Sequence, residues 1–163
     1  PTAGLHFTDE VFASPDSKGV QRTTLTLHVG YGTFSPIRAD NIEDHKLEAE
    51  HFDLSSQTAL TLNATRKAGG RIVAVGTTST RVLESQCVEG MIQTGSGETA
   101  HYIYPPYNFR AVDALQTNFH LPRSSLLALV YAFGGIDFMR EAYRRAIAEK
   151  FRFYSYGDVM LIL

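Results

Sequence analysis

Residues 112–122 read VDALQTNFHLP, an apolar run that turns polar shortly before a proline. The apolar part is typical of a β-strand, and Pro122 prevents continuation of the strand because proline has no N–H to donate. A serine-capped apolar helix is expected to follow. In open α/β sheets, ligands bind where strands end and helices begin, because helix N-termini offer unpaired N–H groups. We therefore expect Thr117, Asn118 and His120 at a ligand-binding edge.

The same kind of pattern predicts the other elements of the chain. We expect strands at 23–29, 71–76, 101–104, 114–117 and 158–163, and helices at 57–68, 77–86, 125–133 and 137–150. The strand at 71–76 is a continuous apolar run, which is typical of a strand covered on both faces. Residues 89–98 show no apolar period and are expected to be a linker or mobile loop. Alternating strands and helices predict an α/β fold, a single domain over residues 1–163 with a largely parallel or mixed sheet flanked by helices.

Size and composition agree with one globular domain. The chain has 163 residues, of which 44% are apolar and 20% charged. The longest apolar run, residues 126–133, is far shorter than the roughly 20 residues that span a bilayer, so we expect no membrane association. Cys87 is the single cysteine, which excludes an internal disulfide and favours a cytoplasmic location.

The net charge of −2 argues against a wholly basic nucleic-acid-binding protein. A local basic face is still predicted on the last helix, which carries Arg140, Arg144 and Arg145. Such a face would suit RNA phosphates. The alternative is a solvated helix surface in which Glu141 pairs with Arg145 four residues later.

A cluster of hydroxyl groups follows the apolar run at 71–76. Residues 76–80 read GTTST, so that a glycine and hydroxyl side chains stand at the start of a predicted helix. Backbone N–H groups and hydroxyls in this position would suit a carboxylate or phosphate. Simple N-capping would need only one of these hydroxyls. The spacing excludes a Walker P-loop.

Histidines and the cysteine provide weaker candidates. The alternation around His28 places this residue on the polar face of its strand, facing solvent or a cleft. His45, Glu48, Glu50 and His51 resemble metal ligands in type, but their spacing does not bring the donors to one side, so no metal site is expected. Cys87 lies near a helix C-terminus, where the helix dipole disfavours a thiolate nucleophile.

Taken together in chain order, many short segments resemble one family, the S-adenosylmethionine:tRNA ribosyltransferase-isomerases of queuosine biosynthesis. The resemblance rests on residues 1–8, 27–34, 45–46, 74–79, 81, 83–85, 104–105, 112–115, 117–122 and 156–158. It covers the whole chain, and departs from the family at Pro106, where a glycine is usual. The first residues resemble the middle of the family's longer chain, so we expect a fragment, roughly the C-terminal half, without the family's inserted β-barrel domain and without turnover of its own.

The resemblance implies a tRNA-modifying reaction. The ribosyl part of S-adenosylmethionine would move to the aminomethyl group of 7-aminomethyl-7-deazaguanine (preQ1) at the wobble position of a tRNA. Adenine and methionine would leave, and epoxyqueuosine-tRNA would form. S-adenosylmethionine is then a co-substrate, preQ1-tRNA is the partner, and neither a metal nor a membrane is required. A monomer is compatible with this scheme.

Roles for individual residues follow from this resemblance only as expectations. The hydroxyls of Thr77, Thr78 and Ser79 would hold the methionine carboxylate at the helix start, and His6 would line the same cleft. Glu84 or His28 would act as a base, and His120 with Asn118 would contact adenine or ribose. A helix-surface role for Glu84 and a loop-amide role for Asn118 are open alternatives. Two competing functions are a non-catalytic module that binds S-adenosylmethionine or tRNA, and a metal-dependent hydrolase using His45, Glu48 and His51.

Overall fold

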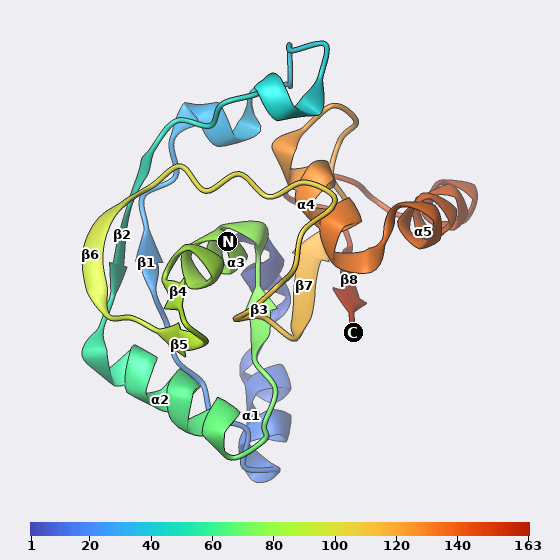
Figure 1. Cartoon of the computed structure of the whole chain (residues 1–163). Helices are drawn as coiled ribbons and strands as arrows, with labels where there is room; N and C mark the ends of the chain where they lie inside the picture. Colours follow the sequence, from blue (N-terminus) through green and yellow to red (C-terminus); the bar gives the residue numbers. More distant parts are fainter.

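The computed structural model describes the backbone of residues 1–163 and all side chains except those of residues 14–17, 31 and 34. Two small three-stranded sheets flank a central helix, with further helices around them (Figure 1). The elements in chain order are η1 (Thr2–His6), α1 (Asp9–Ser17), β1 (Thr26–Leu27), η2 (Tyr31–Phe34), η3 (Ile42–Asp44), β2 (Glu50–Leu54), α2 (Ser56–Lys67), β3 (Val73–Val75), α3 (Thr77–Ser85), β4 (Cys87–Val88), β5 (Met91–Ile92), β6 (Gly95–Thr99), β7 (Ala114–Asn118), α4 (Ser125–Gly134), α5 (Ile136–Ala148) and β8 (Val159–Ile162).

The first sheet has the order β3-β7-β8 and is mixed, as the sequence predicts. Strands β3 and β7 are parallel with Val75 opposite Gln116, whereas β8 runs antiparallel to β7. Because β3 and β7 are parallel, their carboxyl ends lie at the same edge of the sheet. The prediction that the 71–76 run is covered on both faces was wrong, since β3 is an edge strand and Val73 is 51% exposed.

The second sheet is antiparallel, with β2 between β1 and β6. Burial alternates along β2, so that Glu50, Phe52 and Leu54 face inward. Helix α3 contacts strands of both sheets and lies between them (Figure 1). The inward-facing carboxylate of Glu50 is therefore directed toward helix α3 rather than toward solvent.

The segment expected to be a loop at 89–98 instead forms strand structure. Glu89 and Gly90 both have positive φ, at 48° and 79°, and they turn the β4–β5 hairpin. Strand β6 then pairs with β2 along its whole length. Its side chains are small, polar and mostly exposed, so the strand is held by backbone pairing and has no apolar period to reveal it.

Residues 101–104, expected to be a strand, are irregular. Their side chains pack as an aromatic group, with the Tyr102 ring 4.9 Å from that of Tyr104 and 5.2 Å from that of His45. Pro105 and Pro106 follow directly and cannot donate to a strand ladder.

Serine hydroxyls cap two of the helices. The Ser55 and Ser124 hydroxyls accept hydrogen bonds of 3.1 Å from the N–H groups of Thr58 and Leu127, which begins α2 and α4. Helix α5 buries Met139, Tyr143 and Ala146. Within the described part of the chain, no helix combines the length and apolar character that a membrane crossing requires.

Candidate functional site

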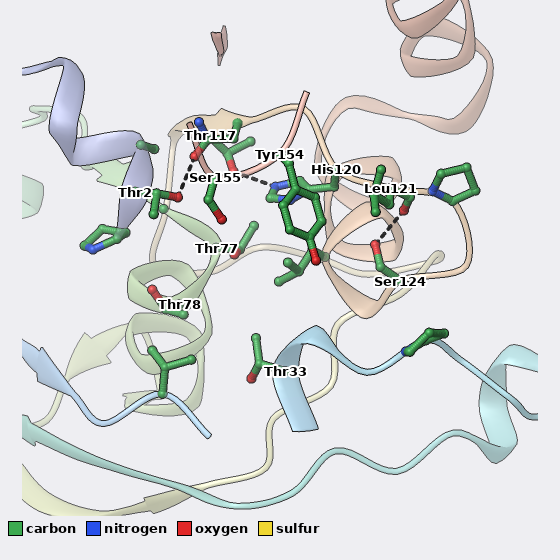
Figure 2. Close-up of a pocket in the computed structure, with 18 of the residues that line it drawn as sticks. Thr2, Thr33, Thr77, Thr78, Thr117, His120, Leu121, Ser124, Tyr154 and Ser155 are labelled. Atoms are coloured by element: carbon green, nitrogen blue, oxygen red, sulfur yellow. Dashed lines mark hydrogen bonds between the residues drawn. The ribbon is translucent and has the colours of Figure 1, made fainter. Parts of the chain in front are cut away.

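A pocket of about 300 Å³ opens at the carboxyl ends of β3 and β7 (Figure 2). We call it the candidate pocket. Five segments far apart in the chain form its walls: the N-terminal residues, the stretch from Val29 through η2, the β3–α3 junction, the stretch from β7 into α4, and the turn before β8. Its polar lining residues are Thr2, Thr33, Thr77, Thr78, Thr117, Asn118, His120, Arg123, Ser124, Tyr154 and Ser155. The position at a strand-to-helix edge is the one predicted from residues 112–122.

The β3–α3 junction brings a helix start against the pocket. Gly76 has φ 92° and its N–H donates to the Gln116 carbonyl oxygen at 2.8 Å. A Cβ at this position would lie 2.4 Å from the Pro1 Cβ, so the close approach of the N-terminal segment requires glycine. No side chain caps α3, and Thr77 and Thr78 both line the pocket. Simple N-capping therefore does not explain the hydroxyl cluster.

The end of β7 supplies a histidine held in one orientation. A hydrogen bond of 2.8 Å joins His120 Nε2 to the Thr117 hydroxyl, and the His120 backbone N–H donates to the Tyr143 hydroxyl at 2.9 Å. Burial lowers the pKa of His120 to about 4, so the imidazole is neutral at pH 7. A neutral, oriented imidazole can donate or accept one hydrogen bond from a ligand.

We expect this partly buried histidine to make stability depend on pH. The unfolded chain protonates His120 near pH 6.5, whereas the folded chain resists protonation down to about pH 4. Stability is therefore fully present above pH 6.5 and falls as the pH drops toward 4, with a loss of about 2 kcal/mol between pH 7 and pH 5. Urea unfolding at both pH values measures this loss, and the variant His120→Gln should show much less of it.

His51→Gln is the control, because the His51 side chain is exposed and, among the described side chains, pairs with Glu98. His101, whose pKa is lowered mainly by burial, should leave a residual pH dependence in the His120→Gln variant. A variant that kept the full wild-type dependence would contradict the assignment to His120.

Asn118 connects the walls of the pocket. The Thr2 hydroxyl donates to Asn118 Oδ1 at 3.0 Å, and Asn118 Nδ2 donates to the carbonyl oxygen of Gly157 at 3.4 Å. His6 Nε2 lies 3.0 Å from the same Gly157 oxygen. His6 therefore supports the turn that lines the pocket, although the side chain is not part of the lining.

The structure does not bring three other predicted residues into the pocket. Ser79 follows Thr78 but is not among the lining residues, and His28 is exposed beside strand β2. Glu84 is fully buried, with 0% exposure, which excludes a helix-surface role. Its carboxylate accepts hydrogen bonds from the backbone N–H groups of residues 110–112 and from the Tyr107 hydroxyl. It organises that loop from inside the protein.

Sequence reasoning missed several lining residues, most clearly Arg123 and Tyr154. Both have positive φ, at 57° and 76°, although neither is glycine or asparagine. Residues other than glycine and asparagine seldom adopt this left-handed backbone conformation, and those that do are concentrated at functional sites. Nothing in the local sequence signals such a conformation.

A buried ion pair supports one wall. Arg81 of α3 pairs with Glu50 of β2, and the two side chains are 3% and 1% exposed. The Glu50 carboxylate also accepts hydrogen bonds from the Thr33 hydroxyl and, at 2.9 Å, from the Gly30 N–H. Burial lowers the pKa of Arg81 to about 10, which leaves the guanidinium charged at pH 7. The pair thus fixes the turn that presents Thr33 to the pocket.

Two other predicted groups lie away from the pocket. On α5, Arg144 and Arg145 both bind the Glu141 carboxylate at 2.8 Å in an exposed cluster, which matches the solvated-surface interpretation of this helix. The sequence also predicts an apolar stripe of Met139, Tyr143, Ala146 and Ile147 on this helix, of which the first three are buried and Ile147 is largely exposed. Among the side chains that the structure describes, His45 packs on Tyr102 while His51 pairs with Glu98, and no group of three potential ligands converges.

Comparisons with known proteins agree across the chain. A family model described as "Queuosine biosynthesis protein" matches residues 1–162. The S-adenosylmethionine:tRNA ribosyltransferase-isomerases of Ralstonia nicotianae and Gluconobacter oxydans are 57% and 59% identical over 163 residues, which are 99% of this chain and 46% and 47% of those proteins. The crystal structure of S-adenosylmethionine tRNA ribosyltransferase from Thermotoga maritima superposes with a TM-score of 0.82 at 46% identity, covering 99% of this chain and 51% of that chain. The chain thus spans about half the length of the relatives it matches.

Proposed function

Because this chain belongs to the queuosine biosynthesis protein family, we propose that the candidate pocket is the S-adenosylmethionine site of a tRNA ribosyltransferase-isomerase. The observation that carries this proposal is the joint placement, in one pocket, of an uncapped helix start with two threonines and a partly buried, neutral histidine. S-adenosylmethionine has a carboxylate for the first feature and a ribosyl-adenine part for the second.

The proposed reaction transfers the ribosyl moiety of S-adenosylmethionine to the aminomethyl group of preQ1 at the wobble position of a tRNA. Adenine and methionine leave, and epoxyqueuosine-tRNA is the product. Such a reaction needs a group that removes a proton beside the sulfonium, stabilisation of departing adenine, and a fixed position for each end of S-adenosylmethionine. S-adenosylmethionine is consumed as a co-substrate in this scheme.

Within this scheme, the start of α3 holds the methionine carboxylate through the hydroxyls of Thr77 and Thr78 and the first backbone N–H groups of the helix. Asn118 holds the pocket wall together, since its side-chain amide is already hydrogen-bonded to Thr2 and to the turn at Gly157. Arg123 contributes the cationic side chain of the lining. A positive charge here favours the anionic end of the ligand and the phosphates of an incoming tRNA.

His120 is the one of the three proposed catalytic residues, Glu84, His28 and His120, that lines the pocket. We assign to it the contact with adenine or ribose. An imidazole with a pKa of about 4 is a weak base, so hydrogen bonding to the leaving adenine suits it better than proton abstraction from carbon. The proton acceptor is then a group that this chain does not place in the pocket, or the substrate amine.

Binding of S-adenosylmethionine by the 163-residue chain tests the proposal, with isothermal titration calorimetry as the measurement. Replacement of Thr78 by valine keeps the shape of the side chain and removes the hydroxyl. We expect the dissociation constant to rise about 10-fold, which corresponds to loss of roughly 1.4 kcal/mol from a charge-assisted hydrogen bond.

Ser79→Ala is the matched control, because this neighbouring hydroxyl does not line the pocket. If Thr78→Val binds S-adenosylmethionine as tightly as the unaltered chain, the start of α3 is not part of the proposed site.

Incubation of the chain with S-adenosylmethionine and preQ1-tRNA then distinguishes an enzyme from a binding module. Release of adenine supports turnover by the chain itself, whereas binding without release supports a module that binds S-adenosylmethionine.

A further inference from the structure

Tyr154 is a large aromatic side chain that lines the candidate pocket while remaining 48% exposed. It follows an aromatic cluster in which the Phe119 ring lies 5.4 Å from Tyr143 and 5.2 Å from Phe153. Tyr154 makes no comparable ring contact among the side chains that the structure describes. Figure 2 shows it among the residues around the pocket, together with His120. A ligand in the pocket can therefore contact this partly exposed ring.

The backbone holds this ring in place at a conformational cost. Tyr154 has φ 76°, in the left-handed region that non-glycine residues seldom adopt. Its N–H donates to the Phe119 carbonyl oxygen at 2.9 Å, and its carbonyl oxygen accepts from the Gly157 N–H at 3.1 Å. At Gly157 a Cβ would lie 2.3 Å from the Arg152 carbonyl oxygen, so the turn is tightly packed. A surface tyrosine needs no such support, whereas a positioned binding residue does.

The charge of the lining indicates which part of a ligand meets this ring. The described lining contains Arg123 and no carboxylate. A cation such as a sulfonium would therefore find no opposite charge there, whereas an uncharged aromatic ring needs none. Val29, Leu121 and Leu126 add apolar surface to the same pocket.

We propose that Tyr154 is the stacking face for the adenine ring of S-adenosylmethionine. The inference rests on the proposed function and adds the residue that selects the base. Stacking on tyrosine recognises the flat face of the ring, while His120 hydrogen-bonds to its edge. The methionine end then extends toward Thr77 and Thr78 at the start of α3.

The experiment compares two ligands, S-adenosylmethionine and 5′-methylthioadenosine, by isothermal titration calorimetry with the 163-residue chain. The second ligand keeps the adenosine part and lacks both the sulfonium charge and the carboxylate. Tyr154→Ala should raise the dissociation constants of both ligands by about 10-fold, equivalent to roughly 1.4 kcal/mol. Tyr154→Phe, which retains the ring, should change both by about 2-fold or less.

Tyr156→Ala is the matched control, because Tyr156 lies two residues away, is 89% exposed and does not line the pocket. Tyr154→Gly is a second variant that removes the ring and relaxes the left-handed backbone, so that weak binding cannot be attributed to misfolding when its thermal midpoint matches the wild-type value. It should lose the same affinity as Tyr154→Ala.

The outcomes separate this inference from the proposed function. Equal affinities in Tyr154→Ala and the unaltered chain would overturn the stacking role and leave the proposed site intact. Loss of affinity for S-adenosylmethionine alone would overturn it as well, since the ring would then contact the sulfonium through a cation–π interaction. An unaltered chain that binds neither ligand would overturn the proposed function itself.

Discussion

Replacement of Arg81 by methionine should lower the free energy of unfolding by about 3 to 5 kcal/mol. The substitution leaves the Glu50 carboxylate buried without its cation, and a buried unpaired charge is among the most destabilising defects in a protein. Native domains are stable by only about 5 to 15 kcal/mol, so the effect removes much of the total. Urea unfolding at pH 7 measures it.

The double variant Glu50→Leu with Arg81→Met provides the control. It removes both charges and fills the same space with apolar groups, so its stability should recover toward the wild-type value. Affinity for S-adenosylmethionine should stay reduced, because Thr33 loses the carboxylate that accepts its hydroxyl hydrogen bond. If the single and double variants were equally unstable, the loss would come from packing rather than from the unpaired charge.

The second large effect is expected at Glu84. Replacement by alanine should cost about 3 to 5 kcal/mol, because three backbone N–H groups lose their acceptor and each unsatisfied buried donor costs roughly 1 to 3 kcal/mol. Thermal and urea unfolding of the Glu84→Ala variant test this value. The Tyr107 hydroxyl, whose pKa is raised to about 12 mainly by burial, would lose the same partner.

Glu98→Ala is the comparison, since Glu98 forms an exposed ion pair with His51 that should be worth about 1 kcal/mol or less. Glu84→Gln separates structure from catalysis, because it keeps one acceptor oxygen and loses proton-accepting capacity. If the unaltered chain releases adenine from S-adenosylmethionine, a Glu84→Gln variant that was fully stable and bound S-adenosylmethionine normally yet released no adenine would return Glu84 to the list of catalytic bases.

Much of the architecture follows from local signals. Ser124 caps α4, the serine-capped helix that the sequence predicts after Pro122, and the polar end of β7 lies with the start of α3 at one sheet edge. These predictions succeed because capping and sheet edges depend on neighbours in sequence or on a single parallel pairing. Strand β6 was not predicted because its polar and glycine residues show no alternation of apolar and polar side chains.

The residues that the sequence misplaced depend on contacts over long separations. Glu84 has the sequence surroundings of an ordinary helical glutamate, and only the loop at residues 110–112 turns it into a buried acceptor. Tyr154 and Arg123 line the pocket with left-handed backbone conformations, and neither is a glycine or asparagine from which such a conformation could be predicted. Thr33 lines it because Glu50 and Arg81 meet beneath it.

The origin of the pocket walls bears on how the protein assembles. Thr2 and Asn118 are hydrogen-bonded across 116 positions of sequence, and Ser155 lies near the other end of the chain. Closing loops of this length has an entropic cost before any contact forms, so the pocket should be completed late in folding and open early in unfolding. A ligand that touches all of these segments acts as a removable cross-link between the two ends of the chain. Its concentration then governs how long the folded state survives, as well as whether the site is occupied.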